Sequence, residues 1–245
     1  MFEYQPSQAF LFNKIILITG AGDGIGKQAA LSYAAYGATV ILLGRTEQKL
    51  VQVYDEIVAN GGATPAIVTL DLQTATAAQY AELAQLLEQE FGHFDGLLHN
   101  ASVLGSLGLL EQMVINSLET VLKVNVTAQA ALTQAVMPLL RAAPSASIIF
   151  TSSSVGRKGR AYWGAYAISK FATEGMMQTL ADELDGSSIR SNSINPGGTR
   201  TSMRASAYPA EDPMTLKTPA DIMPVYLYLM SDDSLNDNGK AFNAQ

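Results

Sequence analysis

The sequence contains no cysteine, only two histidines and a single tryptophan in 245 residues. Without cysteine, disulfides, thiol nucleophiles and thiolate-bound metals are all excluded. His93 and His99 stand in the segment FGHFDGLLHN without the spacing of metal ligands, so we interpret both as structural. The sequence therefore predicts no metal site.

The sequence also lacks an excess of basic residues, blocks of like charge and long apolar runs. Its formal net charge is −7, which argues against a nucleic-acid or anionic-membrane partner. The N-terminus has neither the basic start nor the small-residue cleavage site of a signal peptide. No apolar run is long enough to span a bilayer. We therefore expect a cytoplasmic protein whose partner is a small molecule.

What the sequence does have is an alternation of short apolar runs with helical patterns. The predicted strands are 14–19, 38–43, 66–70, 94–100, 146–152 and 189–194, with 240–242 as a candidate seventh. The predicted helices are 25–36, 46–60, 76–91, 116–141 and 161–185. This alternation predicts an α/β fold with a parallel sheet covered on both faces. No linker divides 1–245, so we expect one domain, with a flap over the substrate near 199–216.

A glycine-rich turn follows the first predicted strand, in TGAGDGIG. Gly20, Gly24 and Gly26 are spaced G-x-x-x-G-x-G, with Asp23 and Ile25 between them, and a helix follows directly. Glycines at a strand–turn–helix junction let backbone N–H groups approach a pyrophosphate, which the helix N-terminus also favours. The turn predicts a dinucleotide site, although Asp23 places a negative charge inside it.

The end of the second predicted strand bears on the choice of dinucleotide. An acidic residue at this point binds the ribose 2′-OH of NAD, whereas an arginine accommodates the 2′-phosphate of NADP. This sequence has Gly44 followed by Arg45 and Thr46, with no acid. The pattern favours NADP(H) and leaves NAD(H) as the alternative.

A candidate catalytic group stands in the last long predicted helix. Tyr166 and Lys170 are one helical turn apart, and Ser153 lies thirteen residues before Tyr166. A phenol beside an ammonium has its ionised form favoured, so we expect the pKa of Tyr166 to fall from ~10 toward neutral pH. Such a tyrosine exchanges a proton with a carbinol oxygen, and a serine hydroxyl holds that oxygen. The competing interpretation is a half-buried helix tyrosine beside a solvated lysine.

Taken together, these motifs resemble the short-chain dehydrogenase/reductase family over nearly the whole chain, and especially its YciK-like oxidoreductase subgroup. The resemblance is carried by TGAGDGIG, Asp71 after strand three, HNAS after strand four, Asn125 in KVNVTAQA, SSSVG, the Tyr166/Lys170 pair and NPGGTRT. It implies a Rossmann-type doubly wound sheet of about seven strands in the order 3-2-1-4-5-6-7.

The resemblance also implies a role for each matching residue. Ser153, Tyr166 and Lys170 would be catalytic, with Lys170 also holding the nicotinamide ribose, and Asn125 would anchor a proton-relay water through a local helix distortion. The implied cofactor-binding residues are Gly20, Asp23, Gly24, Ile25, Gly26, Arg45, Asp71, Leu72, Asn100, Ala101, Tyr166, Lys170, Pro196, Gly197, Thr199 and Thr201. Simpler interpretations remain for Asp71, as a helix cap, and for Asn125, as an ordinary polar helix residue.

One position departs from the family pattern. The family usually has Asn-Ala-Gly after strand four, but this sequence has Asn100, Ala101 and Ser102. A serine fits there only if the backbone avoids a conformation reserved for glycine.

The sequence thus predicts an NADP(H)-dependent oxidoreductase that interconverts a carbonyl and a secondary alcohol. We expect an apolar substrate pocket from VLGSLGLL (103–110), with Tyr162 and Trp163 near its rim. Arg200 and Arg204 are candidate receivers of an acidic substrate. The alternatives are a catalytically weak NADP(H)-binding regulatory or scaffold protein and, more remotely, a methyltransferase. From the family we also expect a homodimer or homotetramer, paired through helices 116–141 and 161–185.

Overall fold

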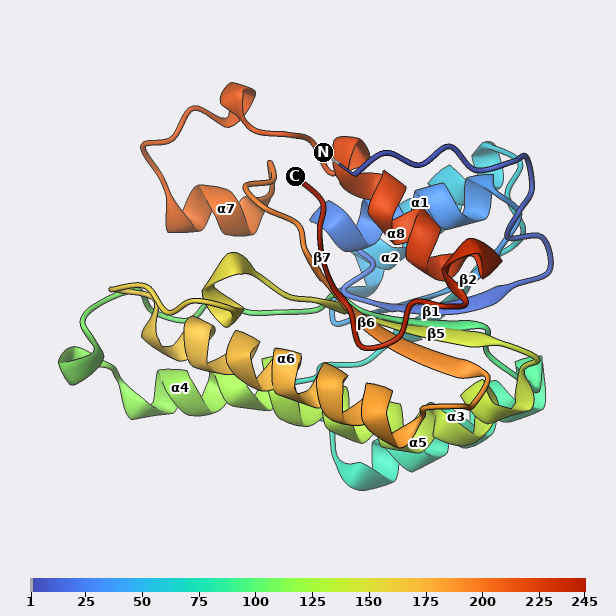
Figure 1. Cartoon of the computed structure of the whole chain (residues 1–245), viewed down its shortest axis with the longest axis horizontal. Helices are drawn as coiled ribbons and strands as arrows, with labels where there is room; N and C mark the ends of the chain where they lie inside the picture. Colours follow the sequence, from blue (N-terminus) through green and yellow to red (C-terminus); the bar gives the residue numbers. More distant parts are fainter. Residues whose placement is uncertain (1) are drawn as a thin grey trace.

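The computed structural model describes residues 2–245, in which a seven-stranded parallel sheet lies between two layers of helices (Figure 1). The strands are β1 Ile15–Thr19, β2 Thr39–Gly44, β3 Ala66–Thr69, β4 Gly96–His99, β5 Ala146–Thr151, β6 Ile189–Asn195 and β7 Ala241–Asn243. Their order in the sheet is β3-β2-β1-β4-β5-β6-β7, and every neighbouring pair is parallel. The predicted Rossmann-type fold and strand order are confirmed.

Helices connect the strands and cover both faces of the sheet. The longer ones are α1 Gly24–Ala35, α2 Glu47–Ala59, α3 Ala77–Phe91, α4 Ile115–Leu122, α5 Ala128–Ala142, α6 Gly164–Glu183, α7 Ser202–Ala207 and α8 Met223–Met230. The short 3-10 turns are η1 Leu110–Gln112, η3 Ser154–Gly156, η4 Pro213–Thr215, η5 Ala220–Ile222 and η6 Asp232–Ser234, and a π-helical segment, η2 Lys123–Thr127, joins α4 to α5. In Figure 1, α1, α2 and α8 lie on one side of the sheet, and α3 to α6 lie on the other.

The core consists of two apolar layers, one on each face. Residues of α1, α2 and α8 pack on one face, with Tyr33 and Tyr226 among the largest buried side chains, and residues of α3, α5 and α6 pack on the other. Because β1, β2, β4 and β5 are covered on both faces, each is a near-continuous apolar run.

Helix α8 is not predicted from the sequence, and α4 and α5 are predicted as one helix, with the distortion that the resemblance implies at Asn125 between them. α8 has the sequence MPVYLYLM, which is apolar on all sides because the helix is buried, so it shows no amphipathic period. The expected helix 116–141 is interrupted by η2, the kind of π-helical insertion that is frequent at functional sites.

The topology brings several loops to one edge of the sheet. In the sheet, β2 lies on one side of β1 and β4 lies on the other. The connections that follow β1 and β4 therefore run away from each other at this point. Ligands of open parallel sheets bind in the crevice that forms there. Within residues 2–245, no helix has the length and apolar character needed to cross a bilayer, and no three acidic or histidine side chains gather in an arrangement fit to hold a metal.

Candidate active site

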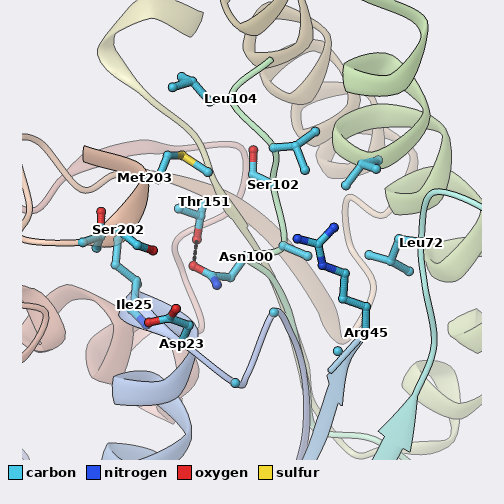
Figure 2. A pocket seen from close by; sticks show the side chains of 18 of the residues that line it. Asp23, Ile25, Arg45, Leu72, Asn100, Ser102, Leu104, Thr151, Ser202 and Met203 are labelled. Carbon is cyan, nitrogen blue, oxygen red and sulfur yellow. Dashed lines mark hydrogen bonds between the residues drawn. The ribbon is translucent and has the colours of Figure 1, made fainter. Parts of the chain in front are cut away.

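A cavity of about 410 Å³ opens at the carboxyl ends of β1, β2, β4 and β5. Its wall includes these residues expected from the sequence: Gly20, Asp23, Gly24, Ile25, Arg45, Asp71, Leu72, Asn100, Ala101, Ser153, Tyr166, Lys170, Pro196, Gly197, Thr199 and Thr201. Figure 2 shows Arg45 and Leu72 at one end of this pocket and Leu104 and Met203 at the other, with Asn100 and Ser102 between them. Gly26 and Asn125 do not line the cavity, but they contact residues that do.

The glycine-rich turn has a conformation that other residues would not tolerate. Gly20 and Gly24 have φ values of +68° and +53°, in the left-handed region that favours glycine. A Cβ on Gly26 would lie 2.2 Å from the carbonyl oxygen of Gly20. The turn therefore forms a cradle of bare backbone at the N-terminus of α1, which fits the pyrophosphate of a dinucleotide.

Asp23 does not place an unpaired negative charge in this cradle. Its carboxylate accepts a hydrogen bond from the N–H of Gly24 at 2.7 Å and forms an ion pair with Lys49 at 2.7 Å. The hydrogen bond from Lys49 is the main cause that lowers the pKa of Asp23. Lys49 also lines the cavity and is not predicted from the sequence. Its position in the first turn of α2, the helix that follows Arg45, was the available signal.

Arg45 stands beyond the end of β2 with its guanidinium exposed. It forms no ion pair with any residue between Phe2 and Gln245. Next to it, Thr46 is the N-cap of α2, but its hydroxyl makes no capping hydrogen bond. This end of the cavity thus presents an uncommitted cation and an uncommitted hydroxyl, a combination that suits a phosphate.

Thr19 orders the floor of the cavity between β1 and β4. Its hydroxyl oxygen accepts hydrogen bonds from the N–H groups of Asn100 and Ala101, both at 3.0 Å. On the other side, the hydroxyl of Thr151 donates to the Asn100 side chain at 3.4 Å (Figure 2). These contacts hold the loop after β4 against β1 and β5.

The predicted catalytic side chains share one wall of this cavity. Tyr166 and Lys170 project from α6 and are almost fully buried, with the Lys170 Nζ 5.4 Å from the centroid of the Tyr166 ring. Lys170 donates a hydrogen bond to the carbonyl oxygen of Thr151 at 2.8 Å. Ser153 caps the 3-10 turn η3, where its hydroxyl oxygen accepts from the N–H of Val155 at 3.4 Å.

The expected lowering of the Tyr166 pKa is wrong for the protein as it stands in this structure. Burial raises the pKa of Tyr166 to about 12, and only the hydroxyl of Ser102 acts in the opposite direction. The ammonium of Lys170 does not outweigh burial, because it is itself desolvated: burial lowers the pKa of Lys170 to about 8. Its hydrogen bond to Thr151 turns it toward the backbone of β5.

Asn125 lies in the π-helical segment η2, so the local helix distortion expected around it is present. Its side-chain oxygen accepts from the N–H of Val103 at 2.8 Å, and its amide donates to the Val103 carbonyl and to Ser169, both at 3.0 Å. Asn125 thereby fastens the loop after β4 to the helix that carries Tyr166. The proton-relay water remains a prediction.

The other end of the cavity is apolar. Tyr166 and Val155 pack in a small cluster with Leu104, Trp163 and Met203. Of the two aromatic residues expected at the rim, Trp163 lines the cavity, whereas Tyr162 is exposed and does not line it.

The two arginines proposed to receive an acidic substrate are already committed. Arg204 forms two hydrogen bonds of 2.6 Å with Glu211 and stacks on Tyr208, 3.8 Å from the ring centroid. Arg200 donates to the backbone carbonyls of Pro213 and Leu216. Both therefore hold the segment 199–216 together, and the expectation of a free anion receiver there is wrong.

Two buried hydroxyls in the cavity wall have no partner. The Oγ atoms of Ser102 and Ser152 form no hydrogen bond with any of residues 2–245. Ser102 is not among the residues with positive φ, so a serine is accommodated there without strain. Unpaired hydroxyls, the glycine cradle and an uncommitted arginine together fit a polar, phosphate-bearing cofactor such as a nicotinamide dinucleotide.

Comparison with known proteins agrees with this geometry. Residues 14–212 match the family model of the short chain dehydrogenases. The chain is 56% identical to the uncharacterized oxidoreductase YciK of Escherichia coli strain K12 over 242 residues, covering 99% of this chain and 96% of that protein. This match confirms the expected subgroup.

Solved structures resemble the whole chain equally closely. A short chain dehydrogenase from Pseudomonas syringae is 58% identical, with a TM-score of 0.99 and full coverage of both chains. One from Shigella flexneri, in complex with NADP, is 55% identical, with a TM-score of 0.96 and coverage of 98% of this chain and 100% of that one. From the fold, the cavity and these relatives, we conclude that the chain belongs to the short chain dehydrogenase family and is an NAD(P)-dependent dehydrogenase/reductase.

Proposed function

We propose that this protein is an NADP(H)-dependent oxidoreductase that interconverts a carbonyl compound and a secondary alcohol, with Tyr166 as general acid and base. The observation that carries the proposal is that one cavity of about 410 Å³ contains both halves of the machinery. The glycine turn and Arg45 line one part of it, and Ser153, Tyr166 and Lys170 line another.

The preference for NADP(H) rests on the charge at the end of β2. Arg45 has no carboxylate partner among the described residues, and the only acid in the glycine turn, Asp23, is neutralised by Lys49. The backbone cradle would hold the pyrophosphate, and Arg45 with Thr46 would hold the 2′-phosphate. The Shigella flexneri relative in complex with NADP supports the same choice. When bound, the nicotinamide supplies or accepts the hydride.

The residues of this chain would move the proton. In carbonyl reduction Tyr166 gives its phenolic proton to the developing alkoxide oxygen, and in alcohol oxidation the tyrosinate takes the proton back. Ser153 would donate a hydrogen bond to the same oxygen. A second positive charge close to the phenol favours the tyrosinate, so Lys170 and an oxidised nicotinamide would act together against the effect of burial.

The apolar end of the cavity indicates the substrate class. Leu104, Trp163 and Met203 surround the region beside Tyr166, and the arginine that lines the cavity from the flap, Arg204, is occupied by Glu211. A neutral, largely apolar ketone or alcohol fits this environment better than a carboxylate, which would have to displace Glu211.

The test is Tyr166→Phe, assayed with a panel of neutral ketones and alcohols. Loss of the proton donor should reduce turnover by about 100-fold or more, while NADPH affinity stays within a few-fold. Tyr162→Phe is the matched control, because Tyr162 is exposed four residues earlier. Undiminished turnover in Tyr166→Phe contradicts the proposal. NADPH binding by the native protein without turnover on any substrate supports the scaffold alternative instead.

A further inference from the structure

Arg157 ends the short turn that Ser153 begins. The 3-10 turn η3 has Ser153 as its N-cap and Arg157 as its C-cap, and the N–H of Gly156 donates to the Ser153 carbonyl at 3.0 Å. A Cβ on Gly156 would lie 2.8 Å from the carbonyl oxygen of Lys170, so the turn packs directly on α6. The position of the Ser153 hydroxyl therefore depends on how both ends of this turn are held.

The guanidinium of Arg157 binds the helix that carries the proposed catalytic pair. Its Nε donates to one carboxylate oxygen of Glu174 at 3.0 Å, and the hydroxyl of Ser193 on β6 donates to the other oxygen at 2.7 Å. Glu174 is only 5% exposed and stands one helical turn after Lys170 on α6. A buried carboxylate needs such partners, because a charge taken out of water without them is costly. Arg157 and Glu174 thus join the end of the Ser153 turn to α6.

The same guanidinium also binds the last strand, β7. It donates to the carbonyl oxygen of Phe242 at 3.0 Å and to the side-chain oxygen of Asn243 at 2.9 Å. The Asn243 oxygen also accepts from the side-chain amide of Asn195 at 3.0 Å, and the Asn195 side-chain oxygen accepts from the N–H of Gly197 at 3.2 Å. Because Gly197 lines the cavity, the contacts of Arg157 extend to the cavity wall after β6.

Gln245 attaches the segment after β7 to the same loop. Its side-chain amide donates to the carbonyl oxygens of Pro196 and Gly198, at 2.6 and 3.2 Å. The loop 196–199 is therefore held from two points, and the strand that holds it is bound to Arg157. Arg157 thus connects two parts of the cavity wall, the Ser153 turn and the loop 196–199.

We propose that Arg157 is a positioning residue that acts through Ser153: its guanidinium locks the end of η3 onto Glu174 and Asn243 and so holds the Ser153 hydroxyl where it meets the substrate oxygen. A planar guanidinium fixes several acceptors in one geometry, which a point charge does not. Misplacement of a substrate-positioning group by about 1 Å is enough to slow a reaction about 100-fold. The proposal rests on the proposed function, in which Ser153 donates a hydrogen bond to the reacting oxygen.

The test is a double-mutant cycle between the ion pair and Ser153. The pair is replaced together, as Arg157→Met with Glu174→Gln, so that no buried carboxylate is left without its partner. This replacement should lower kcat about tenfold, while NADPH affinity stays within a few-fold. Ser153→Ala alone should lower kcat about 100-fold, because a hydrogen-bond donor to the developing charge is lost. In the protein without the pair, Ser153→Ala should cost only about tenfold, since both changes then remove the same interaction.

Two further variants separate positioning from folding. Lys158→Met removes an exposed cation directly after Arg157 and should change neither kcat nor the cost of Ser153→Ala. Asn243→Ala, at an exposed position, removes one acceptor of Arg157 and leaves the Glu174 pair in place. It should lower kcat about threefold at an unchanged melting temperature, and the cost of Ser153→Ala should shrink by the same factor. This variant carries the test if the paired replacement does not fold.

The outcomes distinguish this proposal from the one on which it rests. If Ser153→Ala costs the same factor with and without the ion pair, Arg157 does not act through Ser153, and the proposed function still stands. A lower melting temperature with unchanged kcat also overturns the role of Arg157, since the pair would then support the fold alone. Weaker NADPH binding with unchanged kcat overturns it as well. Undiminished turnover in Ser153→Ala or Tyr166→Phe alone contradicts the proposed function itself.

Discussion

At the scale of single residues, charge is divided unevenly along the cavity. Arg45 is an exposed cation without a carboxylate partner in the described chain, and Asp23 is matched by Lys49 at 2.7 Å. Near Tyr166 the surroundings are apolar, and burial there raises the pKa of Tyr166 and lowers the pKa of Lys170. One end of the cavity therefore suits an anion, and the other suits a neutral reacting group.

The uncommitted charge of Arg45 leads to a prediction on cofactor choice. In Arg45→Ala, loss of the charge-assisted contacts to a 2′-phosphate should weaken NADPH binding by about 10- to 100-fold. NADH has no such phosphate, so its affinity should change by no more than a few-fold. Titration of reduced-nicotinamide fluorescence with each cofactor measures both values. Equal affinities of the native protein for NADH and NADPH would show that Arg45 meets no phosphate.

At the scale of elements, a chain of contacts connects the flap to the helix that carries Tyr166. The ring of Trp163 lies 5.8 Å from the rings of both Tyr166 and Tyr208, measured between centroids. Tyr208 stacks against Arg204, which is held by Glu211. The position of α7 over the cavity is thereby tied to the Arg204–Glu211 pair.

This connection leads to a prediction on substrate charge. Glu211→Gln removes the carboxylate but keeps the size of the side chain, so the guanidinium of Arg204 becomes available to another anion. The ratio of kcat/KM for a keto acid to that for the matched neutral ketone should rise by about two- to fivefold, the modest scale of a partly exposed ion pair. An unchanged ratio would mean that Arg204 does not face the substrate.

At the scale of the whole molecule, α3 to α6 form one outer layer against the sheet (Figure 1). Some apolar side chains of this layer are exposed. On α6, Ile168 and Phe171 are 41% and 48% exposed. Exposed apolar side chains on a long helix that backs the active site suit a helix-to-helix contact with a second copy. We therefore retain the expectation of a homodimer or homotetramer as a proposal.

A charge on this surface should prevent association. Phe171→Glu would have to bury a carboxylate in the contact, and dissociation should become easier by about 30-fold or more. Light scattering coupled to size-exclusion chromatography measures the mass. Leu86→Glu, on an exposed position of α3, is the control and should keep the native mass. A monomeric native protein would contradict the prediction.

The sequence by itself determined the fold and most of the candidate site. Apolar runs alternating with helical patterns identify a parallel sheet, because strands buried on both faces must be apolar throughout. The glycine spacing and the Tyr166/Lys170 pair are local patterns, so the sequence displays them directly. The buried helix α8 escaped detection because it has no polar face to create a period.

Only the tertiary structure decided how these residues are neutralised, paired and desolvated. The pairing of Asp23 with Lys49 and of Arg204 with Glu211, the orphan hydroxyl of Ser102 and the direction of the Tyr166 pKa all depend on through-space contacts. Burial and distance set these electrostatic properties, and both arise only when separate segments pack together.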